Sequence, residues 1–220
     1  APLSLPKRIE AAAGSGKVGV VQTWLAGDGL VDATCVRGGV SGWTLLLIAA
    51  AKGHKQLVEL LLKRGAKPDA QDSIGVTALM AAATISHVQV VETLLQHGAE
   101  VNLQNSVGCT ALMAAANEGH VQVAETLLQH GAELNLQSST ALNGYTALMF
   151  AAHMGQVRVV ELLLRHGAEV DLQDVGGYTA LASAAFHGHS AVLIRLLRAG
   201  ANMALRTAEG KTALQLAKEE

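Results

Sequence analysis

The chain has 220 residues, of which 50% are hydrophobic, 15% are charged and only 3% are aromatic. This composition excludes intrinsic disorder, and a net charge of -2 gives no overall attraction to nucleic acid or to an anionic membrane. No apolar run approaches the roughly 18 residues of a membrane-spanning helix, so we expect no membrane insertion. Because aromatic residues are few, the core must consist of Ala, Leu and Val, which favours closely packed helices.

Two short strings recur along the chain on one period. Gly-x-Thr-x-Leu begins at Gly42 and recurs at intervals of 33, 33, 36, 33 and 33 residues, and Gly-Ala recurs on the same intervals from Gly65. Such a period predicts stacked repeats, since no single unit can bury its apolar face alone. We expect a single domain, 1–220, made of a degenerate N-terminal cap, five full repeats and a terminal half repeat: 7–38, 39–72, 73–105, 106–141, 142–174, 175–207 and 208–220.

One repeat illustrates the local structure that the pattern predicts. Thr77 is expected to cap a first helix over 78–83 by accepting a backbone N–H bond. A second helix starts at His87 and ends at Gly98 in the left-handed conformation that glycine tolerates. The polar stretch 100–106 is too short for a third helix, so it should form an extended hairpin arm.

These residues resemble the ankyrin repeat, which has a 33-residue period and a Thr-Pro-Leu-His-x-Ala signature. The resemblance covers about residues 7 to 220, although Ala and Met replace the Pro and His, as in Thr77-Ala78-Leu79-Met80. Ala is a strong helix former, so this departure leaves the fold intact. The resemblance implies an all-α solenoid with a helix-turn-helix and a β-hairpin loop in each repeat, and a protein-binding function.

Two local departures from the period lead to further predictions. Three extra residues around Ser138–Thr140 should lengthen the hairpin between the fourth and fifth units, either by drift or as a finger that reaches a partner. Ser86 occupies a turn where other repeats have glycine, such as Gly53 and Gly119. We therefore expect Ser86 to adopt a strained positive φ.

Catalytic and cofactor chemistry finds little support in the sequence. The nine histidines fall on repeated positions, with His54, His87, His120 and His189 opening second helices and His97, His130 and His166 ending them. Gly14-Ser15-Gly16-Lys17 superficially resembles a phosphate-binding loop, but Ala11 and Val18 stand where that motif needs Gly and Ser or Thr. We predict no metal site, no cofactor, no catalytic residues and no enzymatic activity.

The resemblance also implies where a partner would bind. In this family, contacts generally come from hairpin tips and the exposed face of the first helix, along a concave surface. Those positions hold Trp43, Lys52, Ile74, Val76, Ile85, Val107, Cys109, Asn117, Glu118, Asn143, Tyr145, His153, Met154, Tyr178, Phe186 and His187, with Ala51, Ser73, Thr84, Ser106 and Val175 beside them.

Aromatic residues gather at these positions, because four of the six in the chain, Trp43, Tyr145, Tyr178 and Phe186, lie there. Exposed aromatic side chains are common anchors of protein interfaces. Trp24 and Phe150 fall on core-type positions and are assigned to packing. The alternative for Val76, Val107 and Cys109 is that they pack on the neighbouring tip.

Charge is distributed unevenly along the chain. Between Lys67 and Arg158 there is no Lys or Arg, whereas seven acidic residues lie there: Asp69, Asp72, Glu92, Glu100, Glu118, Glu125 and Glu133. This acidic belt disfavours nucleic acid and predicts a protein or peptide partner with basic and apolar character. The alternative is that the belt reflects duplication, since 79–104 and 112–137 are near copies.

We therefore expect a monomeric scaffold that binds a protein or peptide. The alternatives are a regulatory or targeting segment of a larger enzyme or channel, and an orphan or engineered scaffold without a natural partner. Two isolated cysteines, Cys35 and Cys109, and the lack of a secretory signal favour an intracellular, cytoplasmic setting. Asn102 and Asn135 occupy hairpin positions that resemble those modified by asparagine hydroxylases in this family, and the sequence leaves open whether they are modified.

Overall fold

The computed structural model describes residues 4–218. The chain divides into two compact units, Ala1–Ser106 and Val107–Glu220. The division falls within one residue of the predicted boundary between repeats 73–105 and 106–141. A solenoid can divide in this way because each repeat contacts only its neighbours.

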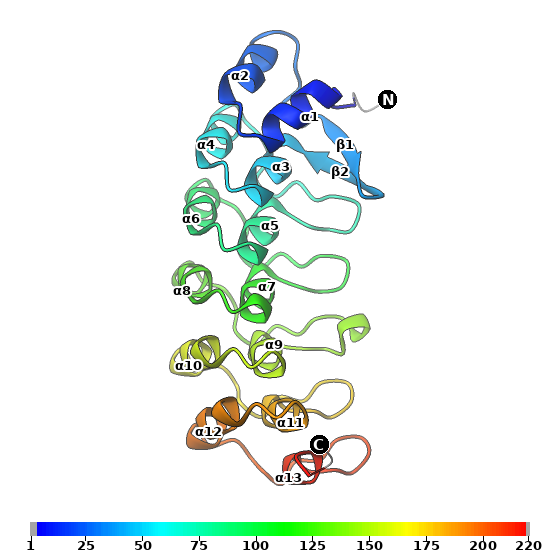
Figure 1. Cartoon of the computed structure of the whole chain (residues 1–220), viewed down its shortest axis with the longest axis vertical. Coiled ribbons are helices and arrows are strands. Elements are labelled where there is room, and N and C mark those ends of the chain that lie inside the picture. Colours follow the sequence, from blue (N-terminus) through cyan, green and yellow to red (C-terminus); the bar gives the residue numbers. More distant parts are fainter. Residues whose placement is uncertain (1–3, 219–220) are drawn as a thin grey trace. The chain divides into compact units, whose positions relative to one another are not determined.

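The described part of the first unit contains three helix pairs and a two-stranded sheet (Figure 1). The first helices of successive pairs pack on one another, α1 on α3 and α3 on α5, and the second helices do the same, α2 on α4 and α4 on α6. The elements are α1 (Lys7–Gly14), α2 (Val18–Ala26), β1 (Thr34–Arg37), β2 (Val40–Thr44), α3 (Leu45–Ala51), α4 (Lys55–Lys63), α5 (Ala78–Thr84) and α6 (Val88–Gln96).

The second unit repeats this arrangement. One layer consists of α7, α9, α11 and α13, and the other of α8, α10 and α12, with successive members of each layer in contact. The elements are α7 (Ala111–Glu118), α8 (Val121–Gln129), the 3-10 helix η1 (Thr140–Leu142), α9 (Ala147–His153), α10 (Val157–Arg165), α11 (Ala180–Phe186), α12 (Ser190–Arg198) and α13 (Ala213–Leu216). Within this unit the hairpin loops project on the side of the first helices (Figure 1).

A buried threonine begins the first helix of each full repeat, as predicted. Thr77 Oγ1 accepts the backbone N–H of Met80 at 3.3 Å, and Thr179 Oγ1 accepts that of Ala182 at 3.1 Å. Thr44, Thr110 and Thr146 make the same bond. Each cap satisfies one of the free N–H groups at a helix start, which is worth about 1 kcal/mol.

In three repeats, the side chain that precedes the second helix bonds to a backbone carbonyl of the repeat before. His189 Nε2 lies 2.8 Å from the carbonyl oxygen of His153, and His54 Nε2 lies 3.0 Å from that of Gly14. Gln156 takes the same role by donating to the Asn117 carbonyl at 3.0 Å. Since a carbonyl only accepts, Nε2 of these histidines carries the proton. The predicted structural role of these repeated histidines is confirmed at the described bonds.

The hairpin loops of the repeats differ in how much regular strand pairing they contain. Within residues 4–218, regular strands occur only in β1 and β2, where Cys35 pairs with Trp43 and a bulge lies between Cys35 and Arg37. In the next repeat the arm is reduced to single bonds, such as Asp72 N to the Val76 carbonyl at 3.1 Å. The predicted hairpin arms are therefore mostly tight loops whose shape depends on side-chain caps.

Both irregularities of the period appear as predicted. Ser86 has a φ of 65°, in the left-handed region that other repeats fill with glycine. The predicted longer hairpin contains the 3-10 helix η1 (Thr140–Leu142), which is followed by Asn143 at a φ of 60°. Ser138 holds the base of this longer hairpin, because its Oγ accepts the Tyr145 N–H at 2.8 Å and donates to the Leu142 carbonyl at 3.0 Å.

Candidate functional site

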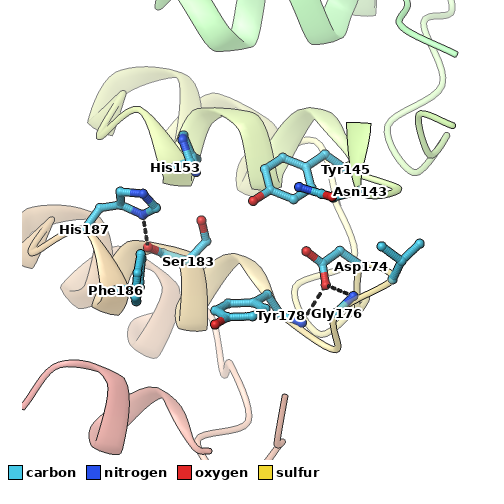
Figure 2. A pocket seen from close by; sticks show the side chains of 10 residues that line it. Asn143, Tyr145, His153, Asp174, Gly176, Tyr178, Ser183, Phe186 and His187 are labelled. Atoms are coloured by element: carbon cyan, nitrogen blue, oxygen red, sulfur yellow. Dashed lines mark hydrogen bonds between the residues drawn. The ribbon is translucent and has the colours of Figure 1, made fainter. Parts of the chain in front are cut away.

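An open pocket of about 300 Å³ lies between repeats 142–174 and 175–207 in the second unit (Figure 2). Its walls come from the two hairpin tips and from α9 and α11. The lining residues are Asn143, Tyr145, His153, Asp174, Val175, Gly176, Tyr178, Ser183, Phe186 and His187. Six of the sixteen predicted partner-binding residues therefore meet in one place, together with Val175.

Aromatic rings form the two walls of this pocket. The Tyr145 ring packs edge-on against Phe150, with centroids 5.2 Å apart, and against His153 at 5.9 Å. On the opposite wall Tyr178 and Phe186 lie edge to face at 6.3 Å. Tyr145 and Tyr178 are half-buried and Phe186 is 44% exposed, so all three remain accessible from the pocket.

Phe150 differs from its predicted place in the core. It is half-buried, and its ring supports Tyr145 from behind the pocket wall. Trp24, also assigned to packing, is half-buried on α2 and lines a second open cavity with Arg8 and Val20. Both residues are therefore only partly buried, and neither belongs to the fully packed interior.

Three histidines cluster at one end of the pocket. The rings of His153 and His187 are 4.1 Å apart, and those of His187 and His189 stack at 6.0 Å. Burial lowers the pKa of His153, and the positive charges that His187 and His189 acquire when protonated lower it further. His153 Nδ1 is buried without a hydrogen-bond partner, whereas His187 Nδ1 donates to the Ser183 carbonyl at 2.9 Å.

Asp174 positions the hairpin and contributes a carboxylate to the pocket. Its Oδ1 accepts the N–H groups of Gly176 at 2.8 Å and Tyr178 at 2.7 Å, as Figure 2 shows. Burial raises the pKa of Asp174, and these two bonds oppose the rise because they favour the charged form. Burial also raises the pKa of Tyr145, and the nearby Asp174 charge adds to this rise.

Ser183 is the most deeply buried polar residue of the lining. It is 3% exposed, and its Oγ makes no hydrogen bond of ordinary geometry. Sequence reasoning missed both Ser183 and Asp174. A signal for Ser183 existed, because the same position in two earlier repeats is Ala81 and Ala114. Asp174 matches Asp72, so its spacing indicates only the structural role of holding the hairpin.

The remaining predicted residues of the second unit lie outside this pocket. Met154 is exposed at the end of α9, and Glu118 is exposed at the end of α7. Asn117 is half-buried and bonds to Glu118 through its side chain at 2.9 Å. Val107 and Cys109 are half-buried on their hairpin, and burial raises the pKa of the Cys109 thiol to about 11. That thiol is therefore protonated and unreactive at neutral pH.

The predicted residues of the first unit occupy the equivalent hairpin and helix positions. Ile74 and Ile85 are exposed, Val76 is half-buried, and Lys52 is exposed at the end of α3. Trp43 on β2 is half-buried beneath the Arg37 guanidinium, which lies 5.5 Å from the ring centroid. These side chains are mostly aliphatic, in contrast to the aromatic pocket of the second unit.

Part of the predicted acidic belt has a structural role. Asp69 Oδ1 accepts the N–H of Glu100 at 2.9 Å, and the buried Asp72 accepts two N–H groups within its own hairpin. Glu125 lies 3.9 Å from His166 Nε2. The belt is therefore partly explained by hairpin construction, and fewer of its charges face solvent than the sequence suggests.

Among residues 4–218, no three His, Cys, Asp or Glu side chains are placed to share a metal ion. No helix in the same range combines the length and the apolar character that crossing a membrane requires.

Comparisons with known proteins identify the family. A model of ankyrin repeats (3 copies) matches residues 9–105, 46–138 and 98–174, and a single ankyrin-repeat model matches 176–208. No curated protein matches the sequence. Among solved structures, the ankyrin repeat domain of Bcl-3, described as a unique member of the IkappaB protein family, is similar at 28% identity and a TM-score of 0.81. That match covers 95% of this chain and 92% of the other. Ankyrin repeats are generally protein–protein interaction modules and are typically non-catalytic. The chain thus belongs to the ankyrin-repeat family, as a helical array whose paired helices stack in a solenoid.

Proposed function

We propose that this protein is a recruitment scaffold whose second unit binds a protein or peptide at the pocket between repeats 142–174 and 175–207. One observation carries the proposal: Tyr145, Tyr178 and Phe186 converge on an open pocket, although the repeat needs no aromatic residue at any of these positions. The first unit shows this, because it places Val76 and Thr84 at the positions of Tyr178 and Phe186.

Solvent exposure of these rings supports recognition over packing. An aromatic side chain that serves only the core gains from complete burial, whereas Phe186 keeps 44% of its surface in water. Tyr and Phe are rigid and bury a large area for little loss of conformational freedom, so they dominate binding energy in protein interfaces. Exposed Val175 and Met154 extend the apolar character around the pocket.

We propose further that the partner combines basic and apolar side chains. The acidic residues that remain exposed, such as Glu100 and Glu118, favour approach of a basic segment and disfavour nucleic acid. The first-unit positions Trp43, Lys52, Ile74 and Ile85 are a second contact region within this proposal. The protein acts as a monomer inside the cell, without catalysis or a cofactor of its own.

The test replaces the rings with a residue that the repeat already accepts. Tyr145→Val with Tyr178→Val introduces the side chain that Val76 has at the same position, so the hairpins should retain their bonds. Proteins captured from a lysate by the wild-type chain should be lost with this variant, and a purified captured protein should bind at least tenfold more weakly. Val36→Ala, a change at a 66% exposed residue of the first unit that lies outside the proposed contact residues, is the control. Equal capture by the wild-type chain and the double variant would remove the pocket from the proposed function.

A further inference from the structure

We infer that the pocket between α9 and α11 receives an arginine side chain of the partner. This inference rests on the proposed function and narrows it to the chemistry of one anchoring residue. It comes from the charge of the pocket, from the arrangement of its rings and from two hydroxyl groups that lie together between its walls.

The pocket favours a cation because of its lining. Asp174 is the only lining residue that carries a full charge at neutral pH apart from any fraction of protonated histidine, and that charge is negative. Its Oδ1 is occupied by the hairpin N–H groups, and the carboxylate can accept further bonds at its other oxygen. No Lys or Arg lines the pocket. The Asp174 carboxylate would repel a carboxylate or phosphate group of a ligand, whereas it would attract a basic side chain.

The rings on both walls provide the second favourable interaction. Tyr145 on one wall and Tyr178 with Phe186 on the other present aromatic surface to the same space (Figure 2). Aromatic faces carry partial negative charge and attract a cation placed within about 6 Å of the ring centre. The carboxylate and the rings therefore select the same ligand charge.

Two hydroxyl groups lie together between the walls of the pocket. Ser183 Oγ is buried and makes no hydrogen bond of ordinary geometry, and Figure 2 shows it directed into the space between α9 and α11, on the side of the Tyr145 hydroxyl, with which its side chain interacts. Two hydroxyl oxygens and one carboxylate can all accept, so a ligand rich in donors can bond to them together.

Arginine fits these acceptors better than lysine does. They lie in different places, with Asp174 at the hairpin tip, Ser183 on α11 and Tyr145 at the start of α9. A guanidinium presents five N–H donors in a plane and stacks against aromatic rings, whereas an ammonium concentrates three donors at one strongly hydrated point. The half-open shape of the pocket admits such a side chain from an extended partner segment.

The experiment uses the full 220-residue chain and three blocked amino acids, so that no natural partner is needed. Nα-acetyl-arginine N-methylamide is titrated against protein with labelled Tyr and His rings, followed by two-dimensional NMR. The citrulline and lysine analogues are titrated in parallel. Citrulline keeps the shape of arginine and removes its charge. We expect saturable shifts of the Tyr145, Tyr178 and His153 ring signals, with arginine bound roughly fivefold more tightly than citrulline.

Asp174→Asn tests the carboxylate while keeping an oxygen that can accept the hairpin bonds. In this variant the arginine and citrulline analogues should bind with nearly equal dissociation constants. Asp72→Asn makes the same change in a first-unit hairpin and should leave the preference unchanged, which controls for any effect on the hairpin itself. Because the ligand comparison is made on the wild-type chain, it holds even if a variant folds poorly.

Three results would overturn the inference: equal binding of citrulline and arginine, tighter binding of lysine than of arginine, or no shift of the three ring signals. The proposed function is judged separately by the Tyr-to-Val variant. If that variant loses its partner while citrulline equals arginine, the pocket binds a partner through apolar contacts and only the arginine assignment fails.

Discussion

The hairpin over 72–77 in the first unit and the hairpin over 174–179 in the second have the same internal bonds. In both, an aspartate oxygen accepts two N–H groups of the loop, and the aspartate N–H bonds to a carbonyl four residues later. In both, the preceding glutamine, Gln71 or Gln173, bridges to the next hairpin. The backbone design is therefore identical in the two units.

The side chains that this design displays are different. The residue before the capping threonine is Val76 in one hairpin and Tyr178 in the other, and the helix ends carry Ile85 and His187. Because the same bonds form with either set, these positions are not required for folding. The comparison separates a repeated scaffold from a variable surface, and the second unit uses the variable positions to build its pocket.

The largest expected effect comes from the shared core, which should be equally important in both units. Leu79 is 1% exposed and Leu181 is 2% exposed, at the same position of their repeats. Leu79→Ala and Leu181→Ala should each lower the free energy of unfolding by about 2–5 kcal/mol, because each leaves a cavity. Urea unfolding followed by circular dichroism measures this loss.

Leu214 provides the control, since it has the same register in the last half repeat but is 66% exposed. Leu214→Ala should leave stability nearly unchanged. The prediction fails if only one of Leu79→Ala and Leu181→Ala lowers the free energy of unfolding, or if Leu214→Ala lowers it strongly. Either result would show that equivalent repeat positions do not contribute equally to the core.

The hairpin aspartates should have the next largest effect. Asp72→Ala and Asp174→Ala each leave two loop N–H groups without their acceptor, which should cost about 1–3 kcal/mol of stability in either unit. Asn keeps an acceptor oxygen, so Asp→Asn should cost less at both positions. If the Ala and Asn variants lose equal stability, the hydrogen bonds to the aspartate side chain do not stabilise the hairpins.

The turn between helices gives a stabilising prediction. Ser86→Gly should raise the free energy of unfolding by about 1 kcal/mol, because glycine adopts the observed φ of 65° without strain. The reverse change one repeat earlier, Gly53→Ser, should destabilise. Its new Cβ would be strained at a φ of 71° and would lie 2.7 Å from the His87 ring. The melting temperatures of both variants are compared with that of the wild-type chain. If Ser86→Gly leaves the melting temperature unchanged, Ser86 is not strained in this turn.

The smallest effect is a pH dependence confined to the pocket. The folded-state pKa of His153 is lower than its unfolded value near 6.5, so the unfolded chain binds the proton first as pH falls. Its contribution to stability is complete above pH 6.5 and is lost as pH falls through the folded pKa. The titratable groups that face it are His187 and His189 from the next repeat and Tyr145 from its own hairpin.

His153→Asn should therefore flatten the decrease in melting temperature between pH 7.5 and 5.5. Asn is the matched replacement because Asn117 has the same position one repeat earlier. If the plots of melting temperature against pH are parallel for the wild-type chain and the variant, the surrounding rings do not lower the pKa of His153.

Much of the pocket follows from the sequence because each repeat position has one structural role. Tyr145, Tyr178 and Phe186 could be placed beside one another once the period was known. Phe150 and Ser183 could not, since they share a helix position that is a half-buried Ala in two earlier repeats and gives no sign of a pocket there. Whether that position is buried or lines a pocket depends on the size of the side chains opposite it.

The amino-acid sequence alone determined the repeat period, the threonine caps, the strained turn at Ser86 and the lengthened hairpin, because these depend on interactions within a few residues along the chain. Only the tertiary structure decided that Asp174 lines a pocket with aromatic residues on both walls and that Ser183 Oγ lies buried beside the Tyr145 hydroxyl. Those features arise from packing between neighbouring repeats, where distances depend on every side chain at the contact and not on the period.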